Sequence, residues 1–237
     1  ISMSGLAEIL FEEHFTISGS DSKESELTRH LEHMGMQIFY GQKASNIIEG
    51  IDLIVYTAAI REDNPEFAAA KEKGIPMLSR AELLGQIMDN YQNSIAVSGT
   101  HGKTTTTSMI SQILLAAKKD PTITVGGILK AIDGNLRVGK SDVFISEACE
   151  YTNSFLNFRP KYSIILNIEA EHLDFFKDIH DIRNSFHLFA KNTKENGAII
   201  INGEIENYQE IVEGLAPQVI TYGMSDACDF YPADITF

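Results

Sequence analysis

Residues 99–105 bring together residue types that bind phosphate. They read Gly-Thr-His-Gly-Lys-Thr-Thr, after an apolar run at 95–97 and before apolar side chains that recur at helical spacing. A glycine turn between a strand and a helix presents backbone N–H groups and the positive end of the helix dipole to an anion. Lys103 would then contact the β- and γ-phosphates of a nucleotide, and the Thr104 hydroxyl would bind Mg²⁺.

This loop departs from the usual phosphate-binding pattern at one place. That pattern has a glycine five positions before Gly102, where this chain has Val97. An ordinary strand-to-helix turn with a solvated lysine is the alternative interpretation. We favour a nucleotide-phosphate site because the segments that follow supply further groups for the same chemistry.

Carboxylate and imidazole side chains follow two more predicted strands. Glu147 comes directly after an apolar strand at 142–146, and a strand at 162–168 leads to His172. The carboxyl ends of parallel strands meet at one edge of a sheet, so these groups should converge on the phosphate loop. Mg²⁺ prefers oxygen ligands, which suits Thr104 and Glu147, and a second Mg²⁺ could accept the imidazole. The alternatives are a helix cap for Glu147 and a surface histidine for His172.

The composition indicates a soluble enzyme. The chain has 237 residues, 43% of them hydrophobic, and a net charge of −14 from 33 acidic and 19 basic residues. Such a surface repels nucleic acid and anionic membranes, so we expect neither as a partner. Only Cys149 and Cys228 are present, without metal-ligand spacing, which favours a cytoplasmic location. No apolar run approaches the ~20 residues of a membrane span. The sequence leaves the oligomeric state open.

Strands and helices alternate along the whole chain, which predicts the α/β class with mostly parallel sheets and flanking helices. The polar stretch 89–93 divides the pattern into a Rossmann-like N-terminal domain at 1–92 and a P-loop-containing ATPase domain at 93–237. The chain opens on a predicted helix. We therefore expect the first strand of the Rossmann-like domain, and the glycine loop after it, to lie upstream.

The first domain has candidate ligand residues near the ends of two predicted strands, at 15–18 and 51–56. Ligands of open α/β sheets bind at such ends. The alternative is that the polar residues among them cap helices, and one residue can do both. The candidate substrate-binding residues are Ser18, Ser20, Asp21, Thr57, Ala58, Ala59 and Asn64.

Three segments together resemble the Mur ligases, the ATP-dependent amide-forming enzymes of peptidoglycan precursor synthesis. They are 99–105, Glu-Ala-Cys-Glu at 147–150, and Asn-Ile-Glu-Ala-Glu-His-Leu-Asp at 167–174. The resemblance extends through 18–21, 57–60 and 63–65, and it is greatest to the members that add L-alanine to UDP-N-acetylmuramate. The family commonly has Asp where this chain has Cys149 and Glu171. These departures put the positioning of the muramyl substrate in question more than the metal site.

The resemblance implies a reaction and a set of site residues. ATP, with Mg²⁺, would activate the carboxylate of UDP-N-acetylmuramate as an acyl phosphate, which the amine of L-alanine then attacks. Lys103, Glu147 and His172 would be catalytic, and Thr104, Glu147 and His172 would bind metal. His101, Asn153 and Ser154 would face the muramyl end of the substrate. The implied ATP-binding residues are Gly99, Thr100, His101, Gly102, Lys103, Thr104, Thr105 and Asn167.

The resemblance also implies a third, carboxyl-terminal domain, and the chain stops where it would begin. We therefore expect residues 1–237 alone to bind Mg-ATP weakly and to form no amide. Two other functions stay open. One is a sibling Mur ligase that adds another amino acid or a peptide to a UDP-muramyl substrate. The other is a non-catalytic module that binds a nucleotide or a UDP-sugar.

Overall fold

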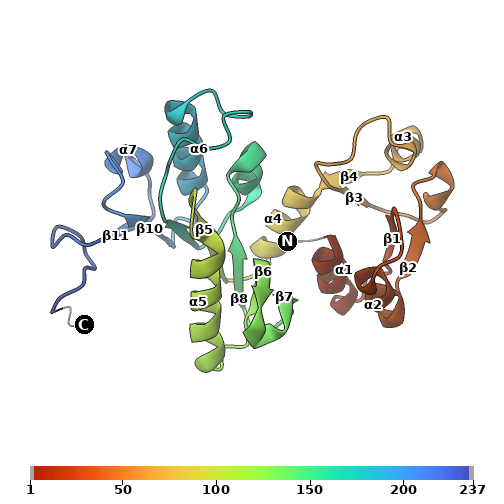
Figure 1. The fold of residues 1–237 in the computed structure, drawn as a ribbon, viewed down its shortest axis with the longest axis horizontal. Helices are drawn as coiled ribbons and strands as arrows, with labels where there is room; N and C mark the ends of the chain where they lie inside the picture. The colour runs from red at the N-terminus through yellow and green to blue at the C-terminus, as the bar shows by residue number, and fades with distance from the viewer. Residues whose placement is uncertain (1–2, 235–237) are drawn as a thin grey trace. The chain divides into compact units, whose positions relative to one another are not determined.

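The computed structural model describes residues 3–234. The chain divides into two compact units, residues 1–84 and 85–237, and the division falls within helix α4 (Arg80–Asp89). Strands and helices alternate along both units, except that β8 follows β7 directly (Figure 1). Among the described residues, every pair of neighbouring strands is parallel except β6 with β7. The predicted α/β class is confirmed.

The first unit contains two separate parallel strand pairs, β1–β2 and β3–β4, with helices beside them. Local signals define helix α2, because Ser25 and Thr28 form a reciprocal capping box at its start. Gly35 ends it in the left-handed conformation, at φ 104°. The elements are α1 (Met3–Glu12), β1 (Ser18–Asp21), α2 (Glu26–Met34), β2 (Gln37–Tyr40), the 3₁₀ turn η1 (Ala44–Asn46), β3 (Ile54–Tyr56), α3 (Pro65–Glu72) and β4 (Met77–Ser79).

Strand β1 corrects one prediction. The sequence predicts a strand at 15–18 with a ligand-binding loop after it, whereas the structure places Ser18, Ser20 and Asp21 within the strand itself. The pairing with β2 runs from Ser18 opposite Gln37 to Asp21 opposite Tyr40. Backbone groups make this pairing, so it does not need apolar side chains. Phe15, which suggested the earlier start, is 59% exposed.

The second unit is built on one sheet of seven strands in the order β11-β10-β9-β5-β8-β6-β7. Strand β5 lies between β8 and β9, which precede the other two predicted site segments. The predicted convergence of the three strand ends is therefore confirmed. The elements are β5 (Asn93–Ser98), α5 (Lys103–Ala116), β6 (Thr122–Leu129), η2 (Lys130–Ile132), β7 (Gly134–Arg137), β8 (Val143–Glu147), η3 (Tyr151–Asn157), β9 (Tyr162–Ile165), α6 (Ile179–Lys191), β10 (Ala198–Asn202), α7 (Gln209–Val212) and β11 (Gln218–Tyr222).

Apolar side chains of the central strands form the core of this sheet. Helix α5 packs against β5, β6 and β8, over a cluster of four buried residues: Val97, Ile123, Ile145 and Ile164. A second group joins η3 to α6, where the Phe155 and Phe189 rings stack with centroids 4.8 Å apart. This packing fixes the segments that carry the candidate site. Within residues 3–234, no helix is long and apolar enough to cross a membrane.

Candidate active site

The phosphate loop lies between β5 and α5, as predicted. Gly99 has φ 139°, and a Cβ there would lie 2.9 Å from Leu166 Cβ. Gly102 directly precedes α5 with φ 83°, a left-handed conformation that glycine adopts readily. Helix α5 then begins at Lys103 and runs for 14 residues. Its first turn carries the exposed Thr104 and Thr105, and its N-terminal N–H groups lack intrahelical partners.

Asn167 fixes the shape of this loop. Its Oδ1 accepts a hydrogen bond from the His101 N–H at 2.7 Å, and its Nδ2 donates to the His101 carbonyl at 3.1 Å. The Thr100 N–H donates to the Asn167 carbonyl, and the Thr100 hydroxyl accepts from the Glu169 N–H. Both polar atoms of the Asn167 side chain are therefore hydrogen-bonded to the loop. Its contact with the nucleotide remains a prediction.

Lys103 is folded back onto its own loop and onto a buried carboxylate. Its Nζ donates to the carbonyls of Gly99 and Thr100, at 2.5 and 3.2 Å. It also lies 2.9 and 3.2 Å from the two carboxylate oxygens of Glu150, whose side chain is only 3% exposed. A buried carboxylate requires such a partner, because desolvation without one costs several kcal/mol, on the order of 3–5. Lys103 therefore balances a charge inside the fold.

Glu147 is the last residue of β8, and a glycine pair of β6 faces it. Its Oε1 accepts a hydrogen bond from the Gly126 N–H at 2.6 Å. A Cβ at Gly126 would lie 2.9 Å from Glu147 Oε2, and one at Gly127 would lie 3.4 Å from Thr104 Cγ2. The two oxygen donors predicted to bind metal, Thr104 and Glu147, thus border the same short stretch of β6. Hydroxyl and carboxylate oxygens fit Mg²⁺.

His172 lies in the loop after β9 with a left-handed backbone, at φ 55°. Its Nε2 is 3.7 Å from Glu150 Oε1, so Glu150 lies within reach of both His172 and Lys103. Glu150, Glu171 and His172 each offer a ligand atom within 4.8 Å of the other two. The structure thus places His172 beside Glu150, and Thr104 and Glu147 beside the glycines of β6. The predicted metal set of Thr104, Glu147 and His172 remains a prediction.

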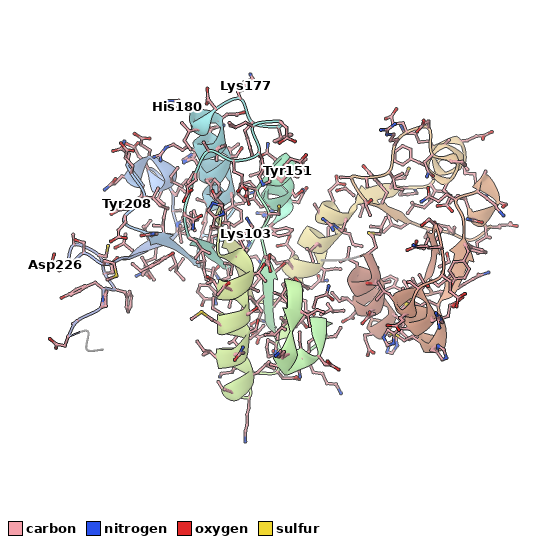
Figure 2. All side chains as sticks on the ribbon, viewed as in Figure 1. Lys103, Tyr151, Lys177, His180, Tyr208 and Asp226 are labelled. Atoms are coloured by element: carbon pink, nitrogen blue, oxygen red, sulfur yellow. The ribbon has the colours of Figure 1, made fainter. Side chains whose placement is uncertain are left out.

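Tyr151 covers one face of His172. The two ring centroids are 4.7 Å apart with the planes inclined at 37°. The Tyr151 hydroxyl donates to Asp174 Oδ2 at 3.0 Å, and this hydrogen bond to a carboxylate raises the pKa of the phenol. Figure 2 labels Lys103 at the start of α5 and Tyr151 on η3, near the end of the sheet where α5 begins.

The residues predicted to face the muramyl substrate have partners of their own. Asn153 Oδ1 accepts a hydrogen bond from the Ser185 hydroxyl at 2.8 Å, which ties η3 to α6. The Ser154 hydroxyl lies 3.1 Å from the Thr152 hydroxyl. The His101 ring extends from the loop to within 3.6 Å of Glu169 Oε2. These predictions stay open.

In the first unit, candidate residues take part in a turn, in a helix cap and in a hydrogen bond between distant segments. The Ser20 hydroxyl donates to Glu66 Oε2 at 2.6 Å. The Thr57 hydroxyl accepts from the Ala59 N–H in the turn that contains Ala58. Asn64 caps α3, because its Oδ1 accepts from the N–H groups of Glu66 and Phe67. A capping role does not exclude a ligand role.

Two family models cover almost the whole chain. The model described as the Mur ligase middle domain matches residues 97–237, and the model described as the Mur ligase family, catalytic domain, matches residues 1–92. The chain belongs to the Mur ligase family. The matches support the resemblance seen in the three sequence segments.

Curated relatives and solved structures of Mur ligases agree with this assignment. The chain is 74% identical over 237 residues to the UDP-N-acetylmuramate–L-alanine ligase of Agathobacter rectalis, covering all of this chain and 52% of the relative. The corresponding ligase of Lachnospira eligens is 58% identical, with 100% and 52% covered. The chain therefore spans about half the length of the curated relatives that it matches.

Two solved structures are similar to this Mur ligase chain. One is UDP-N-acetylmuramate–alanine ligase from Thermotoga maritima, at 30% identity and a TM-score of 0.78, covering 93% of this chain and 50% of that one. The other is UDP-N-acetylmuramate:L-alanyl-γ-D-glutamyl-meso-diaminopimelate ligase from Neisseria meningitides, at 28% identity and a TM-score of 0.84, with 93% and 74% covered.

Sequence reasoning missed three residues of this candidate site. Glu150 belongs to a quoted motif but received no role, because its partner Lys103 is distant in sequence. Gly126 lies inside β6, which continues through it to Leu129. Two adjacent glycines inside a strand signal a close approach by another group, and that signal could have identified the contact with Glu147. Tyr151 carries no sequence signal of its own.

Proposed function

We propose that the protein containing this chain is an ATP-dependent ligase that joins L-alanine to UDP-N-acetylmuramate in peptidoglycan precursor synthesis. The observation that carries the proposal is the 74% identity, over every residue of this chain, to a relative with that name. The proposal places the enzyme in the cytoplasm, with UDP-N-acetylmuramate, L-alanine and ATP as substrates and Mg²⁺ as cofactor.

Within this proposal the second unit activates the carboxylate of the substrate. Residues 99–105 hold the phosphates of ATP through backbone N–H groups, and Lys103 moves from Glu150 to the β- and γ-phosphates. Thr104, Glu147 and His172 would hold Mg²⁺, which neutralises charge on the transferring phosphoryl group when it is bound. His101, Asn153 and Ser154 orient the muramyl end.

The chemistry has two balanced steps. A carboxylate oxygen of UDP-N-acetylmuramate forms a bond to the γ-phosphorus, and the bond from that phosphorus to the ADP oxygen breaks. The L-alanine amine then attacks the acyl carbon and loses a proton, and phosphate departs with the former carboxylate oxygen. Phosphoryl transfer depends mainly on positioning and charge stabilisation, which a lysine within a loop of N–H donors provides.

An isotope experiment with the full-length protein tests this route. Substrate with ¹⁸O in the muramyl carboxylate should transfer one labelled oxygen to the released phosphate at each turnover. Mass spectrometry of the phosphate and of the amide measures where the label goes. If the label stays entirely in the amide and in unreacted substrate, the acyl-phosphate route is excluded.

The similarity to the ligase from Neisseria meningitides, at a TM-score of 0.84, keeps a peptide-adding sibling as the second candidate. The two functions differ in the amine that attacks. Parallel assays with L-alanine and with the tripeptide named for that enzyme distinguish them, because a preference for the tripeptide would replace the alanine proposal. If ATP binds but neither amine reacts, the result would favour the non-catalytic module.

A further inference from the structure

His172 is held on two sides by consecutive residues of the second unit. On one side, Glu150 Oε1 lies 3.7 Å from His172 Nε2. On the other, the Tyr151 ring packs on the imidazole with centroids 4.7 Å apart. The His172 side chain is 33% exposed, so burial alone does not set the orientation of its ring. Rotation about the last torsion of a histidine has only broad preferences, so neighbouring groups decide the plane of the imidazole.

Tyr151 is fastened to the loop that carries His172. Its hydroxyl donates to Asp174 Oδ2 at 3.0 Å, and its ring meets Phe175 edge-on at a centroid distance of 6.1 Å. The same loop is turned back on itself, because the His172 carbonyl accepts the N–H groups of Phe175 and Phe176 at 2.9 Å each. Tyr151 thus contacts this turn at three places: the imidazole, the carboxylate of Asp174 and the ring of Phe175.

The backbone around Tyr151 is also constrained. Thr152 and Asn153 follow it with left-handed φ values of 53° and 57°, and the Asn153 N–H donates to the Glu150 carbonyl at 2.9 Å. Asn153 is bonded to Ser185 of α6, and Phe155 is fully buried. A side chain on such a rigid turn can hold a neighbouring ring in one orientation (Figure 2 labels Tyr151).

We propose that Tyr151 is a positioning residue that fixes the plane of the His172 imidazole, so that Nε2 faces Glu150, the partner of Lys103. This role rests on the proposed function, in which His172 acts beside the transferring phosphoryl group. Groups that orient a functional histidine are worth about 10–100-fold in activity or metal affinity when removed. Glu150 contacts both Lys103 of the phosphate loop and His172, and Tyr151 packs on His172. Contacts of residues 150–151 thus connect the loop after β9 to the phosphate loop.

Histidine NMR of the nucleotide-free, full-length protein tests the packing directly. A ring stacked on an imidazole shifts its carbon-bound protons upfield, and His172→Gln assigns the signal. Tyr151→Leu should move the His172 signal downfield, whereas Tyr151→Phe, which keeps the ring, should leave it upfield. Tyr231→Leu is the matched control, because Tyr231 is 50% exposed and lies far along the chain. An unmoved signal in Tyr151→Leu would overturn the proposal.

Kinetics of the same variants test the consequence. Tyr151→Leu should lower kcat about 10-fold, while the Kd for Mg-ATP stays near the parent value, and Tyr151→Phe should recover most of the rate. An unchanged kcat, or an equal loss in both Tyr151 variants, would contradict the positioning role of the ring. If the parent forms no amide at all, the proposed function fails, and the NMR result decides the positioning of His172 by itself.

Discussion

The two units of the chain hold their candidate residues in different ways. In the second unit, groups that follow different strands contact one another. The Lys103 and Glu150 side chains pair, the Asn167 side chain bonds to the His101 backbone, and the Glu147 carboxylate accepts from the Gly126 N–H. In the first unit, Asn64 and Thr57 bond to the backbone of their own turns, and β1 is mostly exposed. The difference teaches that the candidate phosphate site depends on contacts between segments distant in sequence. The candidate substrate residues combine local turns and a helix cap with two longer-range contacts, Ser20 with Glu66 and Asn64 with Gln42.

The largest expected effect comes from Lys103→Ala in the full-length protein. If Lys103 contacts the transferring phosphoryl group as proposed, loss of that contact should cost about 3–4 kcal/mol, or roughly 10²–10³ in kcat. The variant also leaves the buried Glu150 without a counter-charge, which should lower the free energy of unfolding by about 3 kcal/mol. Turnover assays and thermal unfolding measure the two losses.

A second substitution separates these losses. Lys103→Ala combined with Glu150→Gln should recover much of the stability and none of the rate, because the buried charge is gone but the phosphate contact is not replaced. Lys177→Ala serves as the control for loss of a lysine. An unchanged Tm in Lys103→Ala alone would show that the Lys103–Glu150 pair contributes nothing to stability.

A pair of glycine variants compares the units directly. Gly126→Ala places a Cβ 2.9 Å from Glu147 Oε2, so the flexible carboxylate must shift, and the Mg²⁺ concentration for half-maximal rate should rise with little loss of stability. Gly19→Ala, in β1, meets nothing closer than Ile38 Cδ1 at 3.9 Å and should not destabilise the fold. Chemical unfolding and a magnesium titration measure these effects. An equal Mg²⁺ dependence of the two variants would remove the contrast.

Asn167→Ala should loosen the phosphate loop. It removes two hydrogen bonds to His101, each worth about 1 kcal/mol, and should weaken Mg-ATP binding about fivefold or more. Asn202→Ala is the control, since Asn202 donates to the Leu166 carbonyl nearby but does not contact the loop. Calorimetry should detect the loss of affinity only in Asn167→Ala. The same loss in both variants would show that Mg-ATP affinity depends on the end of β9 in general and not on the two hydrogen bonds between Asn167 and His101.

The smallest effect is expected at Asn64. Asn64→Ala removes the cap of α3 and should cost about 1 kcal/mol, whereas Asn64→Ser should keep most of the stability because serine also caps helices. The KM for the proposed substrate, UDP-N-acetylmuramate, then decides whether Asn64 also contacts it. A raised KM in the serine variant, at normal stability, would give this residue the ligand role that its local contacts do not reveal.

The sequence predicts those parts of the fold that local chemistry determines. The glycine turn between β5 and α5 and the position of Glu147 at the end of β8 follow from residue types and spacing. The same reasoning misplaced β1, because backbone pairing stabilises that strand and its side chains carry no apolar alternation. The residues that pair with β1 lie elsewhere in the chain, in β2, and no pattern within β1 indicates this pairing.

The sequence predicts which residues belong to the candidate site better than it predicts which of them contact one another. Residue types identified Lys103 and His172, but not that Glu150 would lie between them. That contact depends on the η3 turn, where Thr152 and Asn153 adopt left-handed conformations. Neither residue is a glycine, so the sequence gives little sign of the turn.

The position of β5 has a consequence for folding kinetics. Val97 pairs with Glu147, and Ser98 pairs with Ile165, so the strand that carries the phosphate loop is flanked by two strands from much later in the chain. Such non-local parallel pairing forms slowly, because the entropy of closing large loops is lost before the strand contacts contribute any stabilising free energy. The phosphate loop cannot take its final shape until both neighbours are in register. Nucleotide binding during refolding should therefore appear only with the completed centre of the sheet, after the helices have formed.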